Sequence, residues 1–184
     1  MILFTPINKK VFRVMGFADR LVHIIDRFTD LTGRVLAWLA LAMALVTTVI
    51  VVLRYGFNIG SIMAQDSVTY MHACLFMLGT AYALKSGAHV RVDIFYRDFS
   101  DRSRAWVNAL GGVVFLIPLC LFIIGASWHF VTESWNMREV STEAQGLPYV
   151  YLLKSLIPLM AANLLLQGLA ETLRAVQVLR HHGV

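Results

Sequence analysis

The sequence predicts an all-α integral membrane protein with four transmembrane helices and both termini in the cytoplasm (N-in/C-in), preceded by an amphipathic helix at the membrane surface. Hydrophobic residues make up 58% of the 184 residues, and the mean hydropathy is +0.68. Soluble domains contain about 45–50% apolar residues, and here the excess falls in long runs. Lys and Arg flank these runs and gather on one side, which is typical of membrane topology rather than of nucleic-acid binding.

Residues 1–34 are expected to form a cytoplasmic segment that carries the amphipathic helix. Between residues 9 and 33, apolar side chains recur at helical spacing, and basic side chains occupy many of the remaining positions. Such a helix suits the plane of the membrane surface, and packing on a soluble partner is the alternative. Charged residues continue to Arg34 before a full-length apolar run, so a signal peptide, whose apolar stretch has about 7–15 residues, is not expected.

The transmembrane domain is expected to cover residues 35–174, followed by a basic cytoplasmic tail at 175–184. About 20 apolar residues cross the core of a bilayer. Runs of about this length or longer occur at residues 35–53, 67–84, 106–131 and 150–170. Lys154 lies in the first turn of the last run, where a lysine can extend to the lipid headgroups. Pro118 and Pro158 are expected to bend their helices, with neighbouring groups satisfying the freed carbonyls.

The distribution of basic residues predicts the orientation of the runs. Thirteen of the 16 Lys and Arg residues fall on the side that holds both termini and the connection between the second and third runs. The other three fall on the opposite side. Because loops rich in Lys and Arg remain in the cytoplasm, the first side is predicted to be cytoplasmic. The loops at residues 54–66 and 132–149 are then expected to face the periplasm or the exterior.

No set of residues is recognisable as a catalytic, metal or cofactor centre, so the protein is not expected to be an enzyme. The phosphate-binding pattern GxxxxGK[ST] is absent, and no Ser/His/Asp or Cys/His set has a usable context. The predicted spans contain no Asp or Glu, which argues against a self-sufficient proton-coupled carrier, although a small exporter working as a dimer is a third possibility. Cys74 and Cys120 lie in apolar runs and are interpreted as small packing residues.

His72 and His129 favour a different class of protein. In the predicted topology both approach the outer side of the bilayer, one in the second run and one in the third. Two histidines at similar depth can ligate a haem axially, so the alternative function is a four-helix membrane protein of haem- or quinone-linked electron transfer. The simpler interpretation is that both are polar groups satisfied by neighbouring helices or by the headgroups.

Candidate helix caps precede the second and third runs. An acid at a helix N-terminus is stabilised by the helix dipole, so Asp66 is interpreted as a cap, with pairing to a partner's cation as the alternative. Asp98 or Ser100 offers a cap for the third run. Residues 90–94 alternate apolar and polar positions, but between two spans they are expected to lie along the inner membrane surface rather than to form a strand.

Four short motifs occur in a particular order along the chain. They are Arg-Tyr-Gly-Phe-Asn at 54–58, Phe-Met-Leu-Gly-Thr-Ala-Tyr at 76–82, His-Val-Arg-Val-Asp at 89–93 and Gly-Leu-Pro at 146–148. Over nearly all of residues 35–174 the chain resembles the small permease subunit (DctQ family) of tripartite ATP-independent periplasmic, or TRAP, transporters. Segments at 104–107, 154–158 and 166–168 are similar to the mannitol/chloroaromatic-type branch. Gln65 and Asp66 depart from the Gln-Glu or Glu-Glu pair that is common in the family.

The resemblance implies an accessory role in transport across a bacterial inner (cytoplasmic) membrane. In such systems a large permease subunit of the DctM type carries the sodium and substrate sites. A periplasmic solute-binding protein of the DctP type delivers the solute, usually a carboxylate. The small subunit is expected to scaffold the large permease among the membrane lipids, in a symport that uses no ATP. The resemblance does not name the transported solute.

The candidate site residues are those with a partner-contact or structural role in such an assembly. The third and fourth runs are the candidate interface with the large permease. The individual candidates are Asp66, Glu143, Lys154, Gly146, Pro148, His89, Arg91 and Asp93. For Glu143 and Lys154, contact with a partner protein and ordinary contact with lipid headgroups are both open.

Overall fold

The computed structural model describes residues 16–88 and 99–181, and the regular structure among these residues is entirely helical. The elements are α1 (Phe17–Gly56), α2 (Ile62–Lys85), α4 (Asp101–Gly111), the π-helical segment η2 (Gly112–Leu116), α5 (Ile117–Met137) and α6 (Val150–His181). Within this part of the chain, 4 helical stretches are long and apolar enough to cross a membrane, and each contains one of the predicted runs. The predicted fold class, an all-α integral membrane protein, is therefore confirmed.

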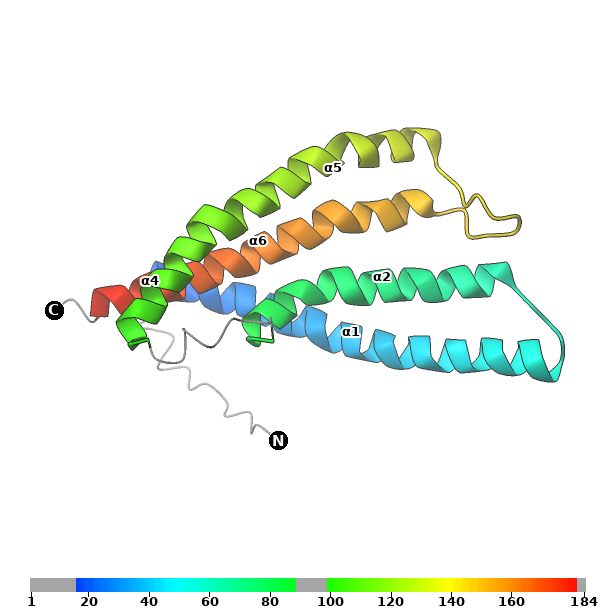
Figure 1. The fold of residues 1–184 in the computed structure, drawn as a ribbon, viewed down its shortest axis with the longest axis horizontal. Coiled ribbons are helices and arrows are strands. Elements are labelled where there is room, and N and C mark those ends of the chain that lie inside the picture. Colours follow the sequence, from blue (N-terminus) through cyan, green and yellow to red (C-terminus); the bar gives the residue numbers. More distant parts are fainter. Residues whose placement is uncertain (1–15, 89–98, 182–184) are drawn as a thin grey trace.

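The long helices form an open layer rather than a closed bundle. Figure 1 shows α6 between α2 and α5, with α1 beside α2. Helix α6 contacts α1, α2, α4 and α5. In its most apolar stretch 28% of the residues are buried, against 6–11% in the other spans. The layer therefore has one central helix, and most apolar side chains of the other helices face outward.

Helix α1 is one continuous helix of 40 residues. At a rise of about 1.5 Å per residue it is about 60 Å long, roughly twice the hydrocarbon core of a bilayer. The sequence predicts a separate surface helix ending near residue 33, but the chain remains helical through Gly33. The ring of Tyr82 lies so close there that an added Cβ would approach Cδ2 to 2.5 Å. Whether residues 17–34 lie on the membrane surface stays a prediction.

Capping side chains define the start of two helices. Ser61 is the N-cap of α2, and its hydroxyl accepts a hydrogen bond from the N–H of Ala64 at 3.3 Å. Ser100 is the N-cap of α4 and accepts from the N–H of Ser103 at 3.3 Å, so of the two caps that the sequence offers, Asp98 and Ser100, the structure uses Ser100. Serine is a preferred cap because its oxygen satisfies an N–H that has no partner within the helix.

The third predicted span is interrupted by η2. The N–H of Ile117 donates to the carbonyl of Gly112, five residues earlier, which is the wider π-helical bond. Pro118 follows directly. A proline in a helix lacks an N–H, and its ring crowds the carbonyl four residues earlier, so the π-helical turn gives room for it. The irregularity expected at Pro118 therefore takes the form of one widened turn.

Candidate functional site

Gln167 is the centre of a buried polar network between α1 and α6. Its side chain is fully buried. Its Oε1 accepts from the Thr29 hydroxyl at 2.8 Å, and its Nε2 donates to Asp26 Oδ1 at 3.3 Å and to Glu171 Oε1 at 3.0 Å. A buried polar group is costly unless it is hydrogen-bonded, and here both ends of the amide have partners. The network fixes the N-terminal part of α1 against α6.

Arg174 completes this set, which we call the Gln167 network (Asp26, Thr29, Gln167, Glu171 and Arg174). The guanidinium pairs with Glu171 at 2.5 Å and also with Asp26. One cation from α6 thus joins an acid of its own helix to an acid of α1. Charge-assisted bonds of this kind are stronger than neutral ones.

Lys85 ties the end of α2 to the same region of α1. Its ammonium lies 2.5 Å from Asp30 Oδ1 and donates to the carbonyl oxygen of Asp26 at 3.1 Å. Sequence reasoning counted Lys85 only as a topology signal and did not predict this pair. The end of the layer that is predicted to be cytoplasmic is therefore held by contacts among α1, α2 and α6.

At the opposite end, Asp66 joins α2 to the loop before α6. Its Oδ2 accepts from the N–H of Leu147 at 2.9 Å. The expected role as the helix cap is wrong, because α2 begins earlier, after Ser61, and Asp66 lies in its second turn. The apolar run begins at residue 67, but the helix begins about one turn earlier, at Ile62.

Gly146 is required by the close approach of this loop to Asp66. A Cβ at this position would lie 2.3 Å from Ser141 Oγ and 2.7 Å from Asp66 Oδ2. Real Cβ atoms essentially never come this close to other atoms, so a side chain here would force Ser141 or Asp66 to shift. Gly146 is a structural residue of the loop, and it keeps the Leu147 N–H within reach of Asp66.

Lys154 pairs within the chain rather than extending freely to the headgroups. Its ammonium lies 2.5 Å from Glu139 Oε2 and 3.9 Å from the centroid of the Phe130 ring. The same Glu139 oxygen accepts from the Ser134 hydroxyl at 2.7 Å. The hydrogen bond from Lys154, followed by that from Ser134, holds the pKa of Glu139 below its usual range. Glu139 was missed from the sequence because no periodic pattern connects it to Lys154.

The remaining candidates lie at the surface or outside the described residues. Glu143 and Pro148 are exposed in the loop between α5 and α6. The backbone carbonyl of Glu143 accepts from the N–H of Gly146 at 3.0 Å, which shapes the turn. His89, Arg91 and Asp93 lie outside the described residues, so their predicted roles stay predictions.

The structure does not bring His72 and His129 together. His72 is on α2 and His129 is on α5, both side chains are exposed, and α6 lies between these two helices (Figure 1). His72 stacks instead on Phe76, with ring centroids 6.4 Å apart. This geometry does not support an axial haem pair. Across residues 16–88 and 99–181, no three His, Cys, Asp or Glu side chains form a group that could hold a metal ion.

Fold and contacts together define a multi-pass helical membrane protein in which several long-range polar contacts join its own helices. The chain belongs to the DctQ family, described as "Tripartite ATP-independent periplasmic transporters, DctQ component", which matches residues 43–178. It is a small subunit of a TRAP transporter in the bacterial inner membrane, and it is not an enzyme. Members of this family associate with a large permease and a binding protein.

Two named relatives agree with this assignment. The chain is 30% identical over 130 residues to "Putative TRAP transporter small permease protein" of Haemophilus influenzae, covering 70% of this chain and 78% of the relative. It is 27% identical over 114 residues to "C4-dicarboxylate TRAP transporter small permease protein DctQ" of Vibrio cholerae, covering 59% of this chain and 49% of that protein. No solved structure is significantly similar to the chain.

Proposed function

We propose that this chain is the scaffold subunit of a sodium-driven TRAP transporter. It would brace a large permease of the DctM type during uptake of a carboxylate solute that a periplasmic protein of the DctP type delivers. The large permease would supply the sodium and substrate sites. The C4-dicarboxylate in the name of the Vibrio cholerae relative fits a carboxylate solute.

The open layer of helices is the observation that carries this proposal. A transport pathway needs polar groups lining a route through the membrane. At one end of the layer, hydrogen bonds and ion pairs join the members of the Gln167 network to one another. At the other end, Glu139 pairs with Lys154. The middle of the layer is apolar and exposed on α1 and α5. Such a layer is suited to packing against another membrane protein rather than to conducting a solute.

A stripe that runs from η2 into α5 is the proposed face for the large permease. Phe115, Leu119 and Phe122 are 73%, 52% and 70% exposed. They are separated by four and three residues, so they lie on one face of the helix. This stripe falls in the third predicted span, which the sequence already favours as interface. Lipid is the competing occupant of the same face.

Cysteine cross-linking from native membranes tests both the function and the face. In a Cys74→Ala/Cys120→Ala background, Leu119→Cys is expected to cross-link to a large permease that copurifies with the tagged chain. Val49→Cys on α1 is the matched control, because Val49 is also exposed, and it is expected not to cross-link to the large permease. Failure to recover a large permease would contradict the function. Cross-linking from Val49→Cys alone would contradict only the face.

A further inference from the structure

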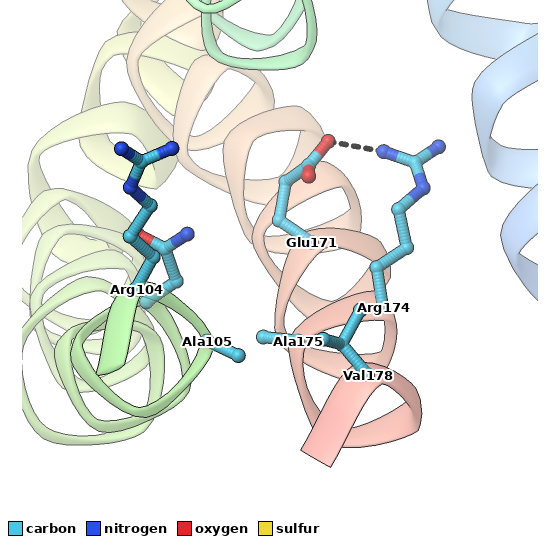
Figure 2. Close-up of a pocket in the computed structure, with 7 residues that line it drawn as sticks. Arg104, Ala105, Glu171, Arg174, Ala175 and Val178 are labelled. Atoms are coloured by element: carbon cyan, nitrogen blue, oxygen red, sulfur yellow. Dashed lines mark hydrogen bonds and ion pairs between the residues drawn. The ribbon is translucent and has the colours of Figure 1, made fainter. Parts of the chain in front are cut away.

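A groove of about 430 Å³ lies between α4 and α6, at the end of the layer where α4 begins and α6 ends. Its polar lining consists of Arg104 and Asn108 from α4 and Glu171 and Arg174 from α6. Figure 2 shows Arg104 and Glu171 reaching in the same direction from the two sides of the groove. Ala105 and Ala175 are buried and face each other where α4 and α6 approach closely, next to the polar side chains of the groove.

The groove combines cationic side chains with a carboxylate that is already paired. Arg174 binds Glu171 and Asp26, and these two bonds use two of the five N–H donors of a guanidinium. Arg104 contributes a second guanidinium from the facing helix. Guanidinium groups match phosphate oxygens with two parallel hydrogen bonds, whereas the paired Glu171 can accept from an amine or a hydroxyl.

The groove lies at the level of the lipid headgroups whichever way the protein is oriented. Its lining residues on α4 surround the beginning of the third predicted span at residue 106, and those on α6 follow the end of the fourth at residue 170. Trp106, two residues after Arg104, is 59% exposed, and Leu110 one turn further into the span is equally exposed. Tryptophan is enriched at this membrane level, and basic pockets between spans suit lipid headgroups.

We propose that this groove binds the phosphate of a membrane phospholipid headgroup. Arg104 donates to the phosphate oxygens, and Asn108 adds a neutral donor, while Arg174, whose guanidinium lies beyond Glu171, holds that carboxylate in place. Glu171 faces the polar group that the phosphate carries, and the acyl chains follow the exposed apolar surface of α4. The site belongs to this chain alone, so it does not depend on the large permease.

Native mass spectrometry of the full, delipidated chain in detergent tests this site. The probe is a short-chain phosphatidylglycerol, with phosphatidylethanolamine as a second lipid and inorganic phosphate as a competitor. Arg104→Gln is expected to weaken binding of the lipids about tenfold, since it removes one charge-assisted contact to the phosphate. Arg102→Gln is the matched control, because Arg102 is an exposed arginine of the same helix that does not line the groove. It is expected to bind as the unmodified chain does.

Three results would overturn the proposal. If both arginine substitutions weaken lipid binding equally, binding depends on general surface charge. If Arg104→Gln does not weaken lipid binding, the groove is not the site. Displacement of lipid by an equal concentration of inorganic phosphate would show a free-anion site instead. If circular dichroism shows that Arg104→Gln does not fold, Val178→Trp fills the groove without changing its charge. Undiminished lipid binding by that variant would also overturn the proposal.

Discussion

The carboxylate of Asp66 and the backbone N–H of Leu147 form a hydrogen bond of 2.9 Å across 81 residues of sequence. This bond joins the second turn of α2 to the loop that leads into α6. The loop passes over Asp66 at Gly146, where no side chain fits. At the end of the layer predicted to face the periplasm, this contact joins α2 to the loop before α6, beside the Glu139–Lys154 pair that joins the end of α5 to α6.

The first prediction concerns Gly146. Gly146→Ala is expected to destabilise the folded chain by about 1–3 kcal/mol, because the new Cβ must displace Ser141 or Asp66. Gly125→Ala is the control, because nothing lies within 4 Å of a Cβ built there. The measurement is the thermal unfolding midpoint of each variant in the same detergent. Equal midpoints for the two variants would show that the loop moves aside without cost.

The second prediction separates the charge of Asp66 from its hydrogen bond. Asp66→Ala removes the acceptor of the Leu147 N–H and is expected to cost about 1–3 kcal/mol. Asp66→Asn keeps a side chain of the same length with an acceptor oxygen, and it is expected to recover part of the stability lost in Asp66→Ala. Hydrogen exchange at the Leu147 amide is the measurement, with faster exchange in Asp66→Ala. If both variants lose the same protection, the charge rather than the acceptor matters.

The third prediction concerns the Gln167 network. Gln167→Leu leaves Thr29 without its acceptor and removes a donor from Asp26 and Glu171. We expect a loss of about 2–4 kcal/mol, since a buried network loses several partners at once. Gln65→Leu, at an exposed position, is the control and is expected to stay within about 0.5 kcal/mol of the unmodified chain.

Limited proteolysis adds a local readout for this variant. Loss of the network is expected to expose the N-terminal part of α1 to cleavage while α5 remains protected. Protection of α1 equal to that of the unmodified chain would show that the apolar contacts of Val22 and Ile25 with Ala170 hold it without Gln167.

The fourth prediction is a pH dependence that requires Lys154. Because its hydrogen bonds lower the pKa of Glu139, the pair stabilises the folded chain fully above the ordinary carboxyl value of about 4.3. This stability is lost as pH falls through the lowered pKa, where Glu139 becomes protonated. Lys154→Met is expected to abolish that contribution. Unfolding midpoints measured between pH 7 and pH 3 should therefore converge for the two proteins at the acid end.

Glu143→Gln is the control for this series, because Glu143 is an exposed carboxylate in the same loop. It is expected to follow the pH profile of the unmodified chain. A different result is that the difference in unfolding midpoint between the unmodified chain and Lys154→Met stays constant down to pH 3. That result would attribute the effect to the contact of Lys154 with Phe130 rather than to Glu139.

Run length predicts the helices of this fold well, because about 20 apolar residues are a physical requirement of the bilayer. Each predicted span lies inside one helical stretch, and the cap at Ser100 follows from the chemistry of its side chain. The continuity of α1 was missed, because its amphipathic part and its span differ in composition but share one helical backbone. A change of composition does not by itself break a helix.

The polar contacts could not be predicted, because they join residues that are far apart in sequence. Gln167 bonds to Thr29 across 138 residues, and a period along one helix carries no information about the facing helix. One signal was present. Gln167, Glu171 and Arg174 are separated by four and three residues, which places them on one face at the end of a span. A polar stripe there indicates a contact between helices.

The single long helix α1 has a mechanical consequence. One rod extends from the contacts of Asp26 and Thr29 at one end of the layer to the turn after Gly56 at the other. From Asp26 to Gly56 the helix is about 45 Å long, so a tilt of about 10° would move one of these points relative to the other by roughly 8 Å. Because the helix between these two points is continuous, a tilt imposed at the Gly56 end would be transmitted to the Gln167 network.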